Sequence, residues 1–343
     1  MAVALLHFFR SFDNAQLSSQ NPVNYTPLST FWNGHFAVAV FFVMSGFLFF
    51  RKFHGVEARA CVRGAIKRYF RLSIPILVLS LIAFGLHQGG QMSNVQAAAT
   101  SGSDWLVKWY RFTPDFKLAV LEPLYSAYVG FDAAYSYNTN LWTISYELFA
   151  VFAMIALAWC CGRLSLATQA VLISLGLALS LGTHYFEFLL GALLAFGLRT
   201  RPLEIKLPIA LAGLTLALIA ARSFQGSLPR EISVNYVYPI AGVVLIAVVE
   251  TCPSLRRWFS TTWLMWLGRI SFGLYLVHFV VLSSVASTAW IASSSLFLTF
   301  AIFSAATIGG AFLFYALVDR PWLAFIDKVF DPKRRSLPSP QTT

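Results

Sequence analysis

Two histidines and one glutamate lie inside long apolar stretches of this sequence, where an ionisable side chain is costly and is therefore a candidate for function. His7 lies in VALLHFF, Glu147 in NLWTISYELFAVFAMIALAW (residues 140–159), and His278 in GLYLVHF. A neutral imidazole can accept a proton from a hydroxyl near pH 7, or it can form a covalent intermediate. His7 is thus the first candidate for a catalytic base, and a structural hydrogen bond between helices is the alternative.

Glu147 follows a polar stretch of its own helix, Trp142, Thr143 and Ser145. Thr143 lies one turn before Glu147 on the same face. A carboxylate at this depth needs a cation or hydrogen-bond donors to keep its charge. Glu147 could orient an imidazole, pair with an arginine, bind a substrate, or only make a hydrogen bond between helices.

Tyr275 and His278 are three residues apart, so they share a helix face and either line a substrate path or join helices. Ser45 and Gly46, in FFVMSGF, favour close helix packing, with Ser45 lining a tunnel wall, because no Gly-x-Ser-x-Gly elbow is present. Gly191 is interpreted in the same way. Three further polar residues are expected near the outer ends of helices, where a role at the rim or in substrate binding is open: His35, His184 and Glu187.

A dense group of cations, Lys67, Arg68 and Arg71, precedes the apolar run at 72–87. Cations at a membrane surface can bind phosphate groups of a nucleotide cofactor. They could also be an anchor that contacts anionic lipid. Near the other end of the chain, Asp319 and Arg320 stand before Pro321, and we expect them to end the last helix and to pair locally.

The elements that position these residues must be membrane helices. Of the 343 residues, 58% are hydrophobic and only 11% are charged, and the mean hydropathy is +0.68. Soluble proteins carry about 25% charged residues, so the composition indicates an all-α polytopic membrane protein. The apolar runs fall at 34–50, 72–87, 140–161, 164–182, 184–198, 207–221, 236–250, 270–290 and 295–317. With an opening helix that contains His7, they predict about ten transmembrane helices.

The net charge of +11 reports topology. If segment 51–71 faces the cytoplasm, 19 of the 25 Lys and Arg residues fall on that side, as the positive-inside rule requires. Nucleic-acid binding is therefore not indicated, and ten helices place both termini in the cytoplasm. The four cysteines lie in or near the inner half, where thiols stay reduced, and no Cys/His spacing indicates a metal site: Cys61, Cys160, Cys161 and Cys252.

The segment from about 88 to 139 is the longest expected on the outer side, and it contains Trp, Tyr and Phe at intervals. These aromatics suit either a cover over a sugar-sized ligand or anchors at the level of the lipid headgroups. We expect residues 1–327 to form one membrane-embedded domain and residues 328–343, which include DPKRRSLPSPQTT, to form a basic disordered cytoplasmic tail.

Five motifs in this order resemble the acyltransferase-3 family of integral membrane O-acyltransferases. They are the early His of VALLHFF, GHFAVAVFFVMSGFLFF (34–50), KRYFRLSIP (67–75), LWTISYELF (141–149) and GRISFGLYLVHF (268–279). Two departures stand out. The family has an Arg eleven positions before the first His, which would fall before Met1, so we expect a first helix truncated at its N-terminus. Lys67 also stands where the family usually has Arg, and it lacks the bidentate fork.

The resemblance implies transfer of an acyl group, most simply acetyl, from cytoplasmic acyl-CoA to a hydroxyl of an extracytoplasmic or lipid-linked carbohydrate at a bacterial-type inner membrane. Under it, His7 and Glu147 are the expected catalytic residues, and no metal and no appended SGNH domain are expected. The cations Lys67, Arg68 and Arg71 would bind the phosphates of coenzyme A. The expected residues of the substrate path or tunnel are Trp142, Ser145, Tyr275, His278 and Ser45.

Several points stay open at the level of sequence. The acceptor, the choice of acetyl or succinyl, the oligomeric state, and direct transfer or an acyl-histidine intermediate are not determined. A proton-coupled transporter or flippase for a glycan or small acid is the alternative function, because intramembrane Glu and His also build proton relays. Transporters often show paired halves with broken helices, and no such symmetry is visible. A purely structural subunit of a polysaccharide machine would leave the buried charges unexplained.

Overall fold

The computed structural model describes residues 1–223 and 228–330, and these residues form helices and connecting segments without a β-strand. The α-helices are α1 (Ala2–Phe12), α2 (Gly34–Phe53), α3 (Ala58–Gln88), α4 (Asn94–Ser101), α5 (Phe116–Leu121), α6 (Trp142–Cys161), α7 (Leu166–Leu179), α8 (Tyr185–Thr200), α9 (Leu207–Ala220), α10 (Arg230–Ile232), α11 (Tyr238–Thr251), α12 (Pro253–Phe259), α13 (Thr262–Val281), α14 (Ser287–Ser293), α15 (Leu296–Phe314) and α16 (Arg320–Phe330). Short 3₁₀ or π segments that matter below are η1 (Asn14–Leu17), η2 (Pro22–Tyr25), η3 (Pro27–Trp32), η5 (Glu122–Ser126), η7 (Thr139–Leu141), η8 (Ser233–Val237) and η10 (Tyr315–Asp319).

Among the described residues, six continuous helical stretches are long and apolar enough to cross a membrane. They are Gly34–Phe53, Ala58–Gln88, Thr139–Cys161, Arg230–Thr251, Thr262–Ser293 and Leu296–Phe330. Three shorter apolar helices accompany them: Ala2–Phe12, Leu166–Leu179 and Leu207–Ala220. The all-α integral membrane architecture is therefore confirmed, whereas the count of about ten spanning helices is confirmed only as far as these six.

Each apolar run of the sequence coincides with a helix, and several helices extend beyond their runs, most of all α3 and the last helix. Helix α3 begins at Ala58, so the cations expected just before a helix lie within it, because Arg, Lys and Ala are good helix formers. The last helix does not end at Asp319 and Arg320, and the expectation of a local pair there is wrong. A π-helical turn at η10 leads into α16, and Pro321, which has no backbone N–H to donate, follows directly after this turn. Of the predicted tail, 328–330 belongs to α16, and 331–343 lies outside the described residues.

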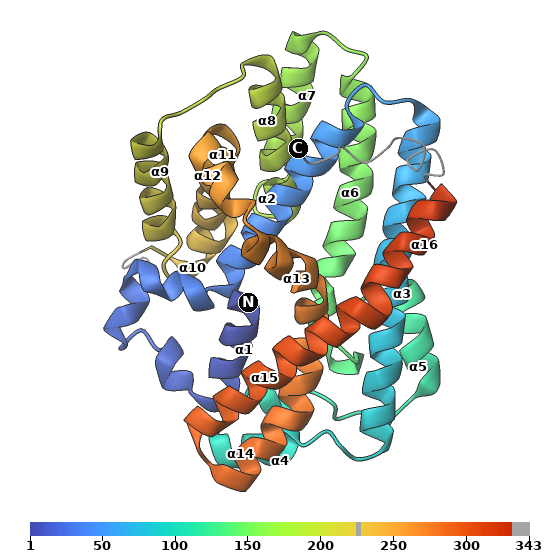
Figure 1. Cartoon of the computed structure of the whole chain (residues 1–343), viewed down its shortest axis with the longest axis vertical. Helices are drawn as coiled ribbons and strands as arrows, with labels where there is room; N and C mark the ends of the chain where they lie inside the picture. Colours follow the sequence, from blue (N-terminus) through green and yellow to red (C-terminus); the bar gives the residue numbers. More distant parts are fainter. Residues whose placement is uncertain (224–227, 331–343) are drawn as a thin grey trace.

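Helix α2 runs through the middle of the molecule, and it packs against α6, α8 and α11 (Figure 1). Its approach to α8 is close because both helices present glycine. A Cβ atom added at Gly46 would lie 1.9 Å from the Phe188 carbonyl oxygen, and one added at Gly191 would lie 2.0 Å from the Val43 carbonyl oxygen. The predicted packing role of Gly46 and Gly191 is confirmed.

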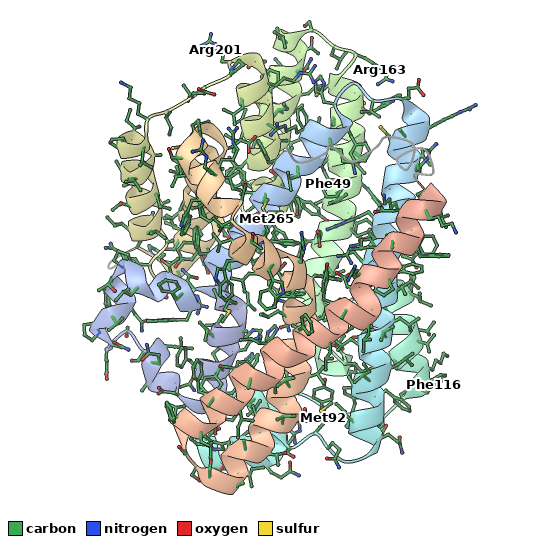
Figure 2. The ribbon with its side chains drawn as sticks, in the orientation of Figure 1. Phe49, Met92, Phe116, Arg163, Arg201 and Met265 are labelled. Atoms are coloured by element: carbon green, nitrogen blue, oxygen red, sulfur yellow. The ribbon has the colours of Figure 1, made fainter. Side chains whose placement is uncertain are left out.

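The two ends of the molecule differ in the segments they carry. Arg163 and Arg201, which belong to two of the loops counted as cytoplasmic, lie at the same end, whereas Met92 and Phe116 lie toward the other end (Figure 2). We call the first the basic end and the second the opposite end. Two of the loops that the charge count places on one side, those of Arg163 and Arg201, therefore lie at the same end of the molecule.

Candidate active site

Two of the predicted residues, His7 of α1 and His278 of α13, are brought together although 271 residues separate them. The Nδ1 atom of His7 lies 3.2 Å from the Nε2 atom of His278, and the two rings meet edge to edge with centroids 5.4 Å apart and planes inclined by 23°. His278 is 1% exposed, whereas His7 is half-buried. The inner imidazole is thus fixed by the protein, and the outer one keeps an accessible edge.

The hydrogen bonds define a direction through this pair. The Nδ1 atom of His278 lies 3.0 Å from the Leu274 carbonyl oxygen, which can only accept, so Nδ1 carries the proton. In the neutral ring Nε2 then accepts, and it accepts from the Nδ1–H group of His7. We therefore assign the neutral His7 as the Nδ1–H tautomer. Its Nε2 atom carries a lone pair and no proton, as a general base requires.

An aromatic wall holds the ring of His7. Trp105 stacks on it with centroids 4.7 Å apart, and Phe279 contacts it edge-on at 6.5 Å. Trp105 comes from the segment between α4 and the 3₁₀ turn η4 (Leu106–Lys108), so part of the long segment 88–139 reaches the site. The same indole carries the guanidinium of Arg10 at 5.2 Å from its ring centroid.

The start of α6 closes the other side. The side-chain amide nitrogen of Asn140 also lies 3.3 Å from Nε2 of His278, so its N–H shares the single lone pair of that nitrogen with Nδ1–H of His7. The Tyr275 hydroxyl donates to the Asn140 carbonyl oxygen and lies 2.5 Å from Oγ1 of Thr143. The neighbouring Asn138 donates its amide to the Leu276 carbonyl oxygen at 2.8 Å. Tyr275 and His278 therefore share the predicted face, and that face contacts the polar entrance of α6.

Glu147 lies elsewhere. It is 1% exposed, and its carboxylate forms an ion pair with the guanidinium of Arg68 on α3. Of the roles left open by the sequence, the structure selects pairing with an arginine. Glu147 and Asn140 are seven residues apart along η7 and α6, so one helix connects the ion pair to the histidine pair.

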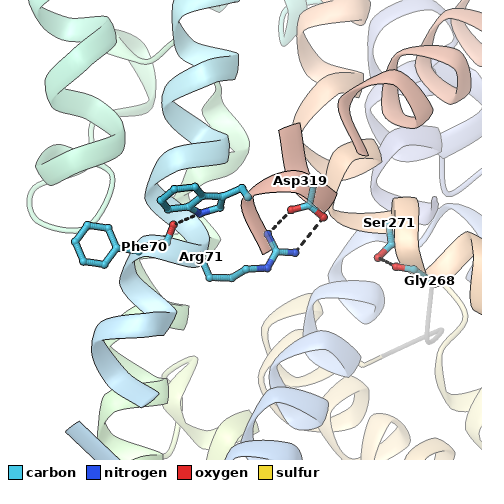
Figure 3. A network of polar contacts seen from close by, with 6 residues as sticks. Phe70, Arg71, Gly268, Ser271 and Asp319 are labelled. Atoms are coloured by element: carbon cyan, nitrogen blue, oxygen red, sulfur yellow. Dashed lines mark hydrogen bonds and ion pairs between the residues drawn. The ribbon is translucent and has the colours of Figure 1, made fainter. Parts of the chain in front are cut away.

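The other two predicted cations are also ion-paired. Lys67 Nζ lies 2.6 Å from Oδ1 of Asp327, and the guanidinium of Arg71 binds the carboxylate of Asp319 with two nitrogens (Figure 3). Asp319 is 2% exposed, whereas the side chain of Asp327 is 49% exposed. These pairs tie α3 to η10 and α16, and a phosphate group would have to exchange with carboxylates here.

The remaining predicted residues lie away from the histidine pair. The ring of Trp142 contacts His184 with centroids 5.3 Å apart, facing α8. Ser145 donates to the Trp142 carbonyl oxygen at 2.7 Å, inside its own helix. Ser45 is buried in α2 beside Gly46. The structure does not bring these three residues into contact with His7.

A buried carboxyl that the sequence did not single out lies in η5 of the segment 88–139. Glu122 is 1% exposed, and its Oε2 atom accepts from Oγ of Ser80 and from the backbone N–H of Tyr137, both at 3.2 Å. Burial raises the pKa of Glu122 to about 7, although hydrogen bonds from Ser136, Tyr137 and Ser80 oppose the rise.

Trp105, Asn140 and Arg10 were missed as site residues. A signal existed for Asn140, because the stretch NTN is an unusually polar entrance to an apolar helix. For Trp105 the only signal was the aromatic content of its segment, which did not distinguish a ligand cover from a lipid anchor.

The comparison with protein families decides the class. The acyltransferase-3 model, described as an acyltransferase domain, matches residues 1–316. The chain belongs to the acyltransferase-3 family. No curated protein and no solved structure matches it. As a family member with long apolar helices, it is an integral membrane acyltransferase, and the family indicates transfer to carbohydrate-type acceptors.

Proposed function

We propose that this acyltransferase-3 protein transfers an acyl group, most simply acetyl, from cytoplasmic acyl-CoA to a hydroxyl of an extracytoplasmic or lipid-linked carbohydrate. His7 is the general base. The observation that carries this proposal is the hydrogen-bond chain from the Leu274 carbonyl through His278 to His7, which leaves Nε2 of His7 unprotonated. The basic end faces the cytoplasm of a bacterial-type inner membrane.

In this reaction Nε2 of His7 accepts the proton of the acceptor hydroxyl while its oxygen attacks the thioester carbonyl carbon. A tetrahedral intermediate forms, the C–S bond breaks, and the departing thiolate of coenzyme A takes the proton from the imidazolium. The hydrogen bond from Nδ1 of His7 to His278 keeps the ring oriented throughout. Holding the two reactants beside this base supplies a large part of the rate.

For the donor, we propose that the phosphates of coenzyme A bind near Lys67, Arg68 and Arg71. Lys67 is the first contact, because its partner Asp327 is half-exposed and exchanges easily with a phosphate. Arg68 and Arg71 hold buried carboxylates, so they orient α3 against α6 and η10. In this scheme Glu147 acts as a positioning residue that keeps Arg68 in place.

The test uses the full chain in sealed vesicles, with labelled acetyl-CoA on the basic side and an oligosaccharide acceptor on the other. We expect acetylated oligosaccharide from the wild type, and we expect His7→Ala to lower the rate by about 10²–10⁴-fold without loss of acetyl-CoA binding. Full activity of His7→Ala would remove the proposed base. Proton-coupled flux of sugar without consumption of acetyl-CoA would instead establish the transporter.

The two routes of acyl transfer are separated by rapid quenching of the same reaction without acceptor. Label that stays on the wild-type chain and is absent from His7→Ala would show an acyl-histidine intermediate. Direct transfer predicts no label on either chain.

The donor site has a natural comparison on the same end of the molecule. A cavity of about 420 Å³ there is lined by other cations, among them Arg51, Arg199 and Arg256. We expect Lys67→Ala to weaken acetyl-CoA binding about tenfold and Arg199→Ala to leave it unchanged. The reverse result would move the phosphate site to this cavity.

A further inference from the structure

A cavity beside α1, the helix that carries His7, has no role in the scheme above. It holds about 450 Å³ and is lined by α1, the segment 13–33, the start of α2, α10 and η8. Figure 1 shows α1, that segment and α10 side by side. Its polar lining includes Arg10, Asn33, His35, Arg230 and Tyr238.

The charge of this cavity is one-sided. Two arginines, Arg10 and Arg230, line it, and none of its described lining residues is acidic. Among the described residues, neither arginine forms an ion pair with a carboxylate. A guanidinium can only donate, so the 2.7 Å contact from Arg230 makes Nε2 of His35 an acceptor. Two guanidinium groups that line one cavity repel each other, although water weakens this repulsion because Arg230 is exposed, and an anionic ligand could bind to both.

The wall of the cavity is preformed. Asn24 is 0% exposed, and its amide donates to the carbonyl oxygens of Gln16 and Ser18, both at 2.8 Å, while its own oxygen accepts from the Trp32 indole. Asn33 caps α2 by accepting from the backbone N–H of Phe36. Since these bonds hold the segment 13–33 in place, a ligand would not have to order it.

The cavity and the proposed donor site lie at different ends of α2. His35 is at the first turn of this helix, whereas Arg68 of the donor site lies over the ring of Phe49, which is fourteen residues, or about 21 Å, further along. The cavity is also close to the base. Arg10 is one turn after His7 on α1, and the side chains of both residues contact the indole ring of Trp105.

We propose that this cavity binds the acceptor carbohydrate through an oxyanion on the sugar, either a carboxylate or a phosphate, held by Arg230 and Arg10. Planar guanidinium groups match both oxyanions with paired N–H donors. This inference rests on the proposed function for the identity of its ligand as an acceptor. The class of acceptor is therefore an acidic glycan or a sugar phosphate, presented from the outer side.

Binding is measured first without acyl donor, on the full chain in nanodiscs of neutral lipid. The probes are an oligosaccharide of hexuronic acid, a neutral oligosaccharide of the same length, and a sugar phosphate. We expect at least one anionic probe to bind about tenfold more tightly than the neutral one, and Arg230→Gln to abolish that preference. The matched control is Arg111→Gln, an exposed arginine that does not line the cavity, which should leave the preference intact.

The preferred probe identifies the oxyanion as carboxylate or phosphate. Equal affinity for acidic and neutral probes, or an unchanged preference in Arg230→Gln, would overturn the proposal. So would displacement of the probes by anionic phospholipid, which would make the cavity a lipid site. Arg10→Lys keeps the charge and should retain part of the preference, which separates loss of charge from misfolding.

Failure here is distinguishable from failure of the proposed function. Selective binding of an anionic sugar without any acyl transfer would keep this site and reject the acyltransferase scheme. Acyl transfer to neutral and acidic sugars with equal KM would keep the acyltransferase scheme and reject the proposed oxyanion site.

Discussion

At the scale of residues, the central feature is the orientation of two neutral imidazoles. The Leu274 carbonyl fixes the proton of His278, and His278 in turn fixes that of His7. His278 takes the place that the carboxylate has in a catalytic triad, because it accepts the hydrogen bond from Nδ1–H of the base. His278 is thus a positioning residue, since it acts on the reacting atoms only through His7.

This role predicts a difference between two substitutions of His278. A Gln side chain can still accept from Nδ1 of His7, whereas Ala cannot. We expect kcat to fall about tenfold in His278→Gln and about 10²-fold in His278→Ala, with KM for acetyl-CoA unchanged in both. Equal losses in the two variants, or a change confined to KM, would assign His278 to a different role.

At the scale of elements, α6 connects the two parts of the site. Its entrance holds His278 through Asn140, and two turns later Glu147 pairs with Arg68 of α3. The sequence predicted both helices and the polar character of Glu147. It did not predict the partner, because contacts between distant segments leave no local pattern. The start of α3 was missed because a basic helical turn outside the bilayer has no apolar signature.

The Arg68–Glu147 pair gives a prediction at this scale. Removing one partner leaves an unpaired charge in a buried site, so Arg68→Leu and Glu147→Leu should each lower the free energy of unfolding by about 3–5 kcal/mol. The double variant should be less destabilised than either single one. The measurement is thermal or chemical unfolding of the three purified variants. Additive losses would show that the two side chains do not depend on each other.

At the scale of the whole molecule, the uneven distribution of Lys and Arg between the loops can be read from the sequence, whereas the cavities cannot. Charge counting needs no knowledge of the fold, and two of the loops that it places on one side, those of Arg163 and Arg201, lie at the same end of the molecule. The cavity beside α1 is formed by Arg10 and Arg230, which are 220 positions apart, and the segment 13–33 that walls it lacks apolar periodicity. Only the packing of α1, α2 and α10 brings those arginines together.

The buried Glu122 predicts how the stability of the whole protein depends on pH. Its carboxyl titrates near 4.5 when unfolded and at about 7 when folded, so the folded state binds more protons between these values. Stability should therefore fall as pH rises from about 4.5 to about 7, by at most about 3 kcal/mol, and then level off.

The test measures the thermal unfolding of Glu122→Gln and of the wild type at several pH values from pH 5 to pH 8. We expect the Tm of Glu122→Gln minus the Tm of the wild type to increase as pH rises. Glu231→Gln is the control, because Glu231 is exposed, and its difference from wild type should not vary with pH. A constant difference for Glu122→Gln would show that the carboxyl is charged throughout this range.

The most direct measurement concerns the nitrogens of His7. Nitrogen-15 NMR of the histidine-labelled chain in nanodiscs distinguishes protonated from unprotonated ring nitrogens, and the spectrum of His7→Gln identifies the His7 signals by their loss. We expect a protonated Nδ1 and an unprotonated Nε2 for His7 at the pH of activity. A protonated Nε2 in the neutral ring would contradict the proposal that this atom takes the proton from the acceptor hydroxyl.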